Sequence, residues 1–541
     1  MVRFNTNNFR RDVISLGFIR LGISFVACVC LVFIFQNRVN GQDFDESESS
    51  FSLNSRALSS VSQSSSLNNV PIQINSSFNQ QAIDEHIQLL ALGTNEHFFD
   101  ELLSRKQYQT DKNSQYNQQA TEAIIQFWHG HGVNLPYIGN DINENIQPQG
   151  SSGQFFSLEP SADDFLYVTN HIRRLMWLDK QTQWNKIALN GLLRLGDGHR
   201  AIKQISQRLW LLGDLVEFDE NEYTYGNDLA FAVKRFQQRH GLTADAVIGP
   251  KTVYWLNLTP KQRARMLAKN FIKKTIYLAS LPERYLLVNI PSYEMFLVDD
   301  YQPVLHSRVI VGRAYRQTPI MTGEISNVVI NPTWTVPKNL MRADILPKIR
   351  ENGHYLTDGQ FDVFDYSGSA VSKSAEEWQS LAGKPFPYRL VQKPGNINAL
   401  GRYKFHFKND SNIYLHDTPN KALFAESERA LSSGCIRVEK VQDLARWFAD
   451  NLIIDKRTWK RLQSDYHSTQ WFAFHDTLPV HFVYWTAWVD SHHLAQFRGD
   501  IYQKNSAYKP QSIEVGHSSE TNFDSNSALS LEVNETFLSA K

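Results

Sequence analysis

One histidine and one cysteine in the second half of the chain have the residue types and spacing of a catalytic base and its nucleophile. His416 ends a predicted strand, and Cys435 follows in the segment Ser-Ser-Gly-Cys-Ile-Arg-Val. A thiol is a weak nucleophile at its ordinary pKa of about 8.5, and an imidazole within hydrogen-bond reach raises the thiolate fraction and carries the proton. The pair therefore predicts nucleophilic catalysis in which Cys435 forms a covalent acyl intermediate.

The residues beside Cys435 have properties that would support such chemistry. Gly434 permits backbone angles that other residues avoid, and it lets a substrate approach closely. The backbone N–H groups of Gly434 and Cys435 could stabilise a developing oxyanion. If Cys435 begins a strand, Arg437 lies on the same face two residues later, where its guanidinium could favour the thiolate or hold a substrate carboxylate.

The cysteine count sets Cys435 apart. The chain has 3 cysteines, and two of them, Cys28 and Cys30, lie in an apolar N-terminal segment where they act as small hydrophobic residues. In an oxidising compartment the remaining thiol has no disulfide partner and is a candidate for reactivity. Composition alone leaves a buried, inert cysteine equally open.

The N-terminus predicts that the rest of the chain is exported. Basic residues precede a mostly apolar segment, residues 13–35, which Arg20 interrupts. This segment is long enough to span a bilayer if Arg20 reaches the cytoplasmic side, and the basic flank predicts that the N-terminus stays inside. Residues 36–41 offer a poor signal-peptidase site. We therefore expect residues 1–41 to be a cytoplasmic tip and an uncleaved signal anchor, with a cleaved signal peptide as the alternative.

The bulk composition indicates a globular chain of several domains without a nucleic-acid partner. The 541 residues exceed the usual size of one domain, and the 42% hydrophobic content supports substantial cores. Lys+Arg and Asp+Glu are both 55, whereas nucleic-acid binding calls for a basic surface. His129 and His131 have no further ligand cluster nearby, so neither a metal nor another cofactor is predicted.

Changes of composition and periodicity divide the first half of the chain. Residues 42–82 are rich in Ser, Asn and Gln and predict a flexible linker, and the polar residues 504–541 predict a disordered tail. Apolar residues at helical spacing predict a helical scaffold over residues 83–198. Residues 199–258 predict a compact unit of three helices.

The second half of the chain has the pattern of short strands. Residues 275–500 are predicted to form a mainly β domain, and residues 338–390, which are charged and partly helical, are predicted to be an insertion into it. Residues 334–336 are expected to extend the sheet, and residues 480–489 to add one more strand. The predicted fold class is therefore multi-domain α+β.

The helical unit at residues 199–258 resembles a known module. The run Ala-Phe-Ala-Val-Lys-Arg-Phe-Gln-Gln-Arg-His-Gly-Leu (230–242), followed by Ile-Gly-Pro-Lys-Thr (248–252), is similar to the three-helix peptidoglycan-binding module. The resemblance implies a wall-binding role, although such modules inside larger enzymes can be purely structural.

Several motifs in the second half resemble the L,D-transpeptidase (YkuD-type) catalytic domain. The runs Tyr-Leu-His-Asp-Thr-Pro (414–419) and Ser-Gly-Cys-Ile-Arg (433–437) look like its signature, and further matches lie at 330–337, 394–401 and 484–489. With the binding module and the insertion, the chain resembles the large Gram-negative L,D-transpeptidases that carry a substrate-capping subdomain.

The resemblance implies a ping-pong reaction on peptidoglycan. Cys435 would attack a donor tetrapeptide stem, D-Ala would leave, and the side-chain amine of an acceptor stem would resolve the thioester into a 3→3 cross-link. Capture by water would instead be L,D-carboxypeptidase action. The resemblance also implies a carbapenem adduct on Cys435 and a periplasmic protein tethered to the inner membrane, with other wall synthases as further partners.

The same resemblance assigns His416 as the general base and acid. Many family members have histidine where this chain has Ser433, whereas the large capped members tend to have serine there. The family usually orients its base with a backbone carbonyl, here that of Asp417. A triad through the Asp417 side chain stays an alternative, although alternation on a strand points that side chain to the opposite face. The residues expected to line the site are Tyr414, Trp334, Ser432, Ser433 and Arg437.

Three further alternatives remain open from the sequence. Trp334 and Tyr414 are equally compatible with ordinary core packing. The insertion at residues 338–390 is expected to act as a lid over the donor peptide, with a passive surface elaboration as the alternative. The chain could also be a non-catalytic wall-binding scaffold, whereas a papain-like protease is disfavoured because that family places its cysteine before its histidine.

Overall fold

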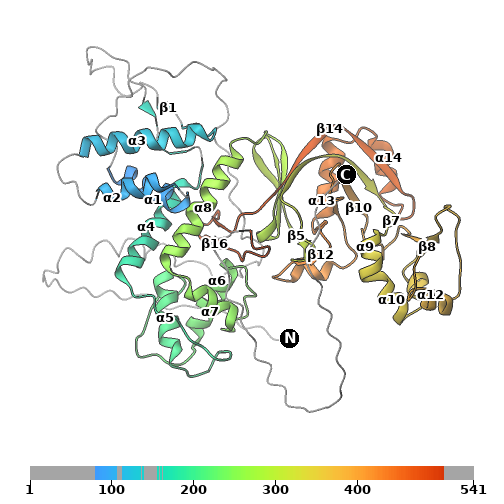
Figure 1. The fold of residues 1–541 in the computed structure, drawn as a ribbon, viewed down its shortest axis with the longest axis horizontal. Helices are drawn as coiled ribbons and strands as arrows, with labels where there is room; N and C mark the ends of the chain where they lie inside the picture. The colour runs from blue at the N-terminus through green and yellow to red at the C-terminus, as the bar shows by residue number, and fades with distance from the viewer. Residues whose placement is uncertain are drawn as a thin grey trace, which may run out of the picture. The chain divides into compact units, whose positions relative to one another are not determined.

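The computed structural model describes residues 80–504, with gaps at 95, 107–112, 136, 139–154, 157–158 and 161 (Figure 1). The predicted signal anchor, nearly all of the predicted linker and tail, and Cys28 and Cys30 therefore lie outside the described residues. In the part of the chain that the structure describes, no helix combines the length and the apolar composition needed to cross a bilayer.

The scaffold region is helical, as the sequence predicts. Its long helix α8 contacts α1 and α4, and a capping box between Thr259 and Gln262 fixes where α8 begins. Apolar side chains at helical spacing on α1, namely Ile83, Ile87 and Leu90, are fully buried. The helices of this group are α1 (Gln80–Gly93), α2 (His97–Lys106), α3 (Asn113–Gly130), α4 (Phe165–Gln181) and α8 (Pro260–Leu278), and the short strands β1 (Tyr137–Ile138) and β2 (Phe155–Phe156) pair beside them.

The three-helix unit has the predicted helices and turns. It consists of α5 (Ala201–Leu212), α6 (Asn227–Arg239) and α7 (Pro250–Asn257). Gly213 ends α5 with a φ of 87°, a left-handed angle that suits glycine at a helix C-terminus. Gln237 of α6 donates to Asp245 and accepts from the backbone of Ala246, so one buried amide holds the loop that leads into α7.

The second half of the chain forms a sheet whose strand pairings close on themselves. The strand order is β12-β5-β13-β11-β10-β6-β14-β3-β4, and β4 also pairs with β5. The eight strands from β5 to β4 thus form a closed ring, and β12 pairs only with β5 outside that ring. The bounds are β3 (Tyr285–Asn289), β4 (Glu294–Asp299), β5 (Gln302–Gly312), β6 (Met321–Ile330), β10 (Tyr403–Phe407), β11 (Leu415–His416), β12 (Ala430–Ser432), β13 (Ile436–Val438) and β14 (Gln470–Val483).

Two helices after the cysteine segment complete the core of this sheet. They are α13 (Val441–Asn451) and α14 (Lys456–Leu462). Phe448 of α13 stacks on Phe405 of β10 with ring centroids 5.2 Å apart, and Trp459 of α14 meets Phe472 of β14 at the same distance. The chain is thus α+β, which confirms the predicted fold class.

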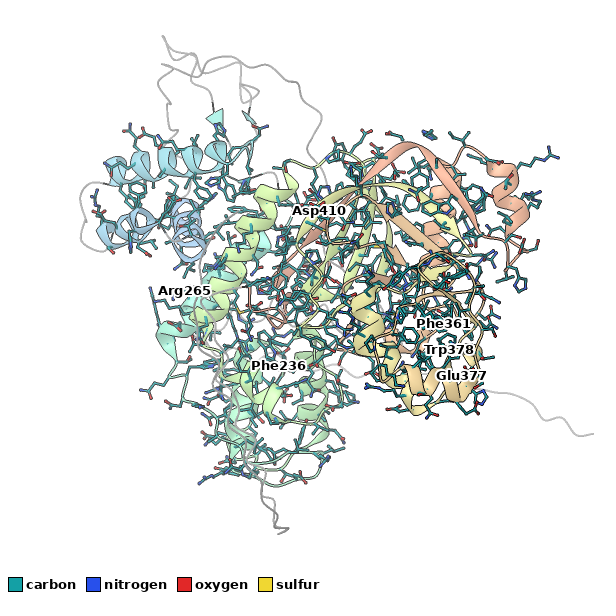
Figure 2. The ribbon with its side chains drawn as sticks, turned by 45° about the vertical axis from the view of Figure 1, so that its right-hand side comes forward. Phe236, Arg265, Phe361, Glu377, Trp378 and Asp410 are labelled. Atoms are coloured by element: carbon teal, nitrogen blue, oxygen red, sulfur yellow. The ribbon has the colours of Figure 1, made fainter. Side chains whose placement is uncertain are left out.

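The insertion has a small sheet and a hydrophobic core of its own, centred on Ile349, Trp378 and Leu390. Phe361 and Trp378 are labelled within it in Figure 2. Its elements are β7 (Trp334–Thr335), α9 (Lys338–Leu340), a π-helical turn (Met341–Ile345), α10 (Leu346–Glu351), α11 (Tyr355–Asp358), β8 (Phe361–Phe364), α12 (Ala375–Leu381) and β9 (Arg389–Gln392). The expectation that residues 334–336 extend the large sheet was wrong, because β7 pairs with β9 of the insertion.

The end of the β region packs into the helical core. The single strand predicted over residues 480–489 is interrupted: β14 ends at Val483, and β15 (Ala487–Val489) begins a hairpin with β16 (Ala495–Phe497). Phe497 is 1% exposed, and its ring stacks on that of His240 at a centroid distance of 5.4 Å. The buried guanidinium of Arg263, on α8, lies 5.4 Å from the same ring. The two halves of the chain therefore share one core.

This shared core predicts that a change in the last hairpin weakens the helical half. Phe497→Ala should lower the local free energy of unfolding of α6 and α7 by about 3–5 kcal/mol, because it removes a buried aromatic side chain and leaves a cavity. Native-state hydrogen exchange measures this free energy helix by helix. The control is Phe231→Ala on α6, whose side chain is 63% exposed, with an expected change below about 0.5 kcal/mol. Equal protection of α6 and α7 in Phe497→Ala and in the unmodified protein would refute the shared core.

Candidate active site

The pairing of β11 with β13 decides which side chains share a face. The two strands are parallel, with Leu415 opposite Ile436 and His416 opposite Arg437. Leu415 and Ile436 are fully buried in the sheet core. Because side chains alternate along a strand, the neighbours Tyr414, His416, Cys435 and Arg437 all point to the other face.

Ring contacts and hydrogen bonds are consistent with this grouping. Residues on adjacent strands that are offset by two positions have Cα atoms about 8 Å apart, which is within reach of histidine and cysteine side chains. The rings of Tyr414 and His416 have centroids 5.5 Å apart. The Cys435 thiol donates to the carbonyl of Asn412 at 3.8 Å, and the Tyr414 hydroxyl lies where it can donate to the deprotonated sulfur. The structure therefore brings together Tyr414, His416, Cys435 and Arg437.

His416 is oriented by a backbone carbonyl. Its side chain is buried, and its Nδ1 lies 2.5 Å from the carbonyl oxygen of Asp417. A carbonyl can only accept, so Nδ1 carries the proton and Nε2 has the free lone pair. The carbonyl of Leu400 is also within hydrogen-bond reach of the ring.

The carboxylate of Asp417 has other partners. It accepts the backbone N–H of Arg402 at 2.9 Å and that of Thr418 at 2.6 Å, and it pairs with the ammonium of Lys421. No hydrogen bond joins it to His416 in the described structure. The Asp417 side chain thus fixes the loop after β11, and its main chain holds the imidazole.

Burial sets the charge states of the two central groups. It lowers the pKa of His416 to about 3, and the nearby guanidinium of Arg437 lowers this pKa too. Burial also raises the pKa of the Cys435 thiol, although hydrogen bonds from Tyr414 and the charges of Lys404 and Arg437 oppose that shift. At neutral pH the resting pair is therefore a thiol and a neutral imidazole, not a thiolate and an imidazolium.

The turn before Cys435 is built around Gly434. Its φ is 120°, an angle that residues with a side chain rarely adopt. Ser432 is 2% exposed; its hydroxyl donates to the carbonyl of Cys435 at 2.6 Å and accepts the N–H of Gly434 at 3.0 Å. These bonds correct two expectations: Ser432 closes the turn instead of lining the site, and the Gly434 N–H is occupied instead of facing a substrate.

The Cys435 N–H remains as a donor for an oxyanion. Among the described residues no acceptor is found for it, whereas the next amide, that of Ile436, donates to the carbonyl of Tyr414 at 3.1 Å. A free amide on Cys435 itself would be well placed to stabilise negative charge on a carbonyl beside the sulfur.

Ser433 belongs to a charged contact that sequence reasoning missed. Arg316, in the loop after β5, donates to the Ser433 hydroxyl at 2.9 Å and to the carboxylate of Asp344 at 2.6 Å. Asp344 comes from the insertion. One guanidinium thus ties the insertion to the residue two positions before Cys435. Nothing in the local sequence identifies this contact, because it joins three segments far apart in the chain.

Lys404 is a second residue that sequence reasoning missed. It lies on β10 opposite His416, and its ammonium is 4.1 Å from the centre of the Tyr414 ring. Burial lowers the pKa of Lys404, while the nearby Cys435 raises it. The sequence did carry a signal for Lys404. Residues 403–407 alternate, so that three aromatic rings face the core and Lys404 faces away from it.

Trp334 connects the insertion to the site. It lies on β7, is half-buried, and its side chain lies close enough to the Tyr414 hydroxyl to lower the pKa of that group. Trp334, just before the insertion, and Asp344, within it, therefore both belong to the surroundings of Cys435. No group of three or more His, Cys, Asp or Glu side chains arranged to hold a metal occurs among the described residues.

Comparison with known families assigns this region. Residues 283–460 match the model of the L,D-transpeptidase catalytic domain, and the matched segment includes both His416 and Cys435. This segment is therefore similar to an L,D-transpeptidase catalytic domain. Residues 198–256 match a second model, described as "Putative peptidoglycan binding domain", which overlaps α5, α6 and α7. Both matches agree with the resemblance seen in the sequence motifs.

Individual relatives of the transpeptidase domain cover parts of the chain. A protein of Haemophilus influenzae named "Putative L,D-transpeptidase" is 38% identical over 221 residues, which are 40% of this chain and 44% of that protein. The chain thus matches less than half the length of this relative. Among solved structures, an L,D-transpeptidase from Stackebrandtia nassauensis covers 54% of this chain and 94% of its own, at 14% identity and a TM-score of 0.21. An L,D-transpeptidase from Mycobacterium smegmatis covers 37% and 58%, at 12% identity and a TM-score of 0.19.

The charge states of the candidate active site predict how the reactivity of Cys435 changes with pH. In the substrate-free protein, the rate of Cys435 alkylation by iodoacetamide should keep rising with pH beyond about 8.5, because burial raises the thiol pKa above its ordinary value. Mass spectrometry of the Cys435 peptide measures this rate. Tyr414→Phe should shift the midpoint of the curve of alkylation rate against pH to still higher pH, since this substitution removes a hydrogen bond to the thiolate. A rate that is already constant between pH 5 and 8 would instead demonstrate a resting thiolate–imidazolium pair.

Proposed function

We propose that the protein is an L,D-transpeptidase that forms 3→3 cross-links in peptidoglycan through a Cys435 thioester. One observation carries the proposal: Cys435 and His416 share a face of two paired strands, and the Asp417 carbonyl holds the imidazole so that Nε2 is free. A scaffold that only binds the wall would need neither a neutral, oriented imidazole nor a half-buried thiol on the same face.

The first half of the reaction releases D-Ala. As the sulfur attacks the carbonyl of the third stem residue, His416 Nε2 takes the thiol proton, and negative charge develops on the carbonyl oxygen. The Cys435 N–H stabilises this oxyanion. The C–N bond then breaks, His416 gives its proton to the departing amine of D-Ala, and a thioester remains.

The second half forms the cross-link. The side-chain amine of an acceptor stem attacks the thioester carbonyl, His416 accepts a proton from that amine, and the sulfur leaves and is reprotonated. The same steps with water as the attacking group would trim the stem to a tripeptide, which is the carboxypeptidase alternative. No cofactor takes part in either half.

Arg437 links substrate binding to proton transfer. Its guanidinium lowers the pKa of His416, and its Nε is buried without a hydrogen-bond partner among the described residues. A stem carboxylate that pairs with Arg437 would neutralise this charge, raise the pKa of His416, and so make the imidazole a stronger base only when the donor is bound.

The insertion at residues 338–390 would act as a cover for the donor stem. This proposal is supported by Asp344, which reaches Arg316, and by Trp334, which precedes the insertion and lies close to the Tyr414 hydroxyl. Closing a site in this way excludes water, and it would favour the acceptor amine over hydrolysis.

The proposed reaction on peptidoglycan also suggests where the protein is located and which partners it has. We propose a periplasmic protein whose N-terminal segment tethers it to the inner membrane, with donor and acceptor stems as its partners and other wall synthases nearby. The domain match at residues 198–256 supports attachment to peptidoglycan. We further propose that carbapenems acylate Cys435.

The reaction can be tested with a disaccharide-tetrapeptide and mass spectrometry. The protein should yield a cross-linked dimer that has lost one D-Ala, and Cys435→Ala should lower the rate by at least about 10³-fold, because the nucleophile is absent. Formation of the tripeptide alone would support the carboxypeptidase reaction. Unchanged substrate, with the unmodified protein equal to Cys435→Ala, would rule out the enzymatic proposal.

Two substitutions separate the Asp417 carbonyl from its carboxylate. Asp417→Asn keeps the carbonyl that orients His416, so we expect kcat to fall less than about tenfold. His416→Gln removes the base and should lower kcat by at least about 10³-fold. If the carboxylate were part of a triad, Asp417→Asn would instead lower kcat by about 10⁴-fold. For both variants, kcat is measured from the rate of dimer formation, and circular dichroism checks that each variant is folded.

A further inference from the structure

A cleft of about 450 Å³ lies between α13, α14 and the start of β10. Its position separates it from Cys435. Tyr403 lines the cleft and belongs to the sheet core, whereas Lys404, the next residue along β10, faces the candidate active site. The cleft therefore lies on the opposite side of the sheet from the reacting sulfur. Its size suits a ligand of a few residues.

The walls of the cleft are strongly basic. Arg402, Arg446, Lys456 and Lys460 line it, against one carboxylate, that of Asp450. Arg446 pairs with Asp443 at 3.4 Å, but both side chains are exposed, and such pairs contribute little.

The other charges near the cleft leave its positive character in place. Lys456 donates to the carbonyl oxygen of Asp450, not to its carboxylate. Asp455 and Asp465 accept backbone N–H groups of their own turns. No ion pair or hydrogen bond engages the ammonium of Lys460 within the described part of the chain. The cleft therefore carries a net positive charge that an anionic ligand can neutralise.

Arg402 is held ready in this cleft. Its guanidinium lies 3.9 Å from the centre of the Tyr466 ring, and one of its terminal nitrogens donates to the carbonyl of Gln463 at 2.6 Å. Its Nε is buried without a hydrogen-bond partner among the described residues. Because the Arg402 guanidinium is already stacked and oriented, its side chain would lose little further conformational entropy on binding an anion.

We propose that this cleft is a second peptidoglycan subsite, which binds a carboxylate-bearing part of a stem peptide away from the reacting centre. Guanidinium and ammonium groups recognise carboxylates by charge-assisted hydrogen bonds. The amide of Gln442 and the ring of Tyr466 also line the cleft, and these groups suit the amide bonds and aliphatic parts of a peptide. This inference rests on the proposed function, since that function supplies the stem peptide.

Hydrogen exchange on the full-length Cys435→Ala protein can locate the ligand. A soluble disaccharide-tetrapeptide should protect residues 441–466 at the cleft and, separately, residues 430–438 at the candidate active site. Adding Lys460→Glu should raise the ligand concentration needed for protection of 441–466 about fivefold, which is the expected effect of one partly exposed charge. Adding Arg461→Glu is the matched control: Arg461 neighbours Lys460 on α14 and is exposed, but it does not line the cleft. It should leave the protection unchanged.

The outcomes distinguish the two proposals. Protection of 430–438 without protection of 441–466 would overturn the second subsite and leave the transpeptidase proposal intact. Absence of protection at both segments, together with no dimer from the unmodified protein, would count against the proposed function itself. A stem whose carboxylates are amidated should no longer protect 441–466. If it still does, or if inorganic phosphate alone at the same concentration protects these residues equally, the assignment to stem carboxylates is wrong.

Discussion

The candidate active site depends on the two-residue register between β11 and β13. With Leu415 opposite Ile436, the flanking residues Tyr414, His416, Cys435 and Arg437 must share the face that points away from the core. A slip of one residue would turn the sulfur and the imidazole to opposite faces. The burial of Leu415 and Ile436, at 0% exposure each, makes such a slip costly. Ordinary hydrophobic packing on one side of the sheet therefore fixes the geometry needed for chemistry on the other.

Burial gives the site a neutral resting state. Desolvation favours the uncharged forms of both Cys435 and His416, and the cations Lys404 and Arg437 stand nearby. Negative charge that develops on sulfur or on a substrate oxygen would thus appear in a positive field that is already in place. If Cys435 acts as proposed, such an arrangement would stabilise the transition state more than the ground state, and it would limit reactions of the thiol when no substrate is present.

The sequence was informative where function depends on neighbours along the chain. The alternation on a strand separated the Asp417 carboxylate from the imidazole, and the helical periods and strand patterns predicted the α+β class. It was less informative where function depends on segments that meet in space. Arg316 and Asp344 are 28 positions apart and belong to different packing units, so no local pattern connects them.

Local hydrogen bonds also rule out the roles in substrate contact that the sequence positions of Ser432 and Gly434 suggested. Ser432 and Gly434 have residue types that suit substrate contact, but a turn with a φ of 120° must satisfy its own polar groups first. Their mutual hydrogen bond uses the donor and the hydroxyl that a substrate would need. The strand at residues 334–336 was predicted but placed in the wrong sheet, and β9 was missed, because both strands are short and they pair across a long stretch of sequence.

The hairpin of β15 and β16 has a consequence for the order in which the chain folds. Phe497 and Ile83 belong to the same buried cluster, although the whole large sheet lies between them in sequence. During synthesis the first helices emerge long before the residue that completes their packing, and loop closure over such a distance is slow. The helical half therefore remains an unfinished, more easily opened structure until the last strands have been made. In a truncated chain that lacks the final hairpin, the helical half would unfold most easily. Proteases would therefore cleave the N-terminal helices first, although the truncation lies at the other end of the chain.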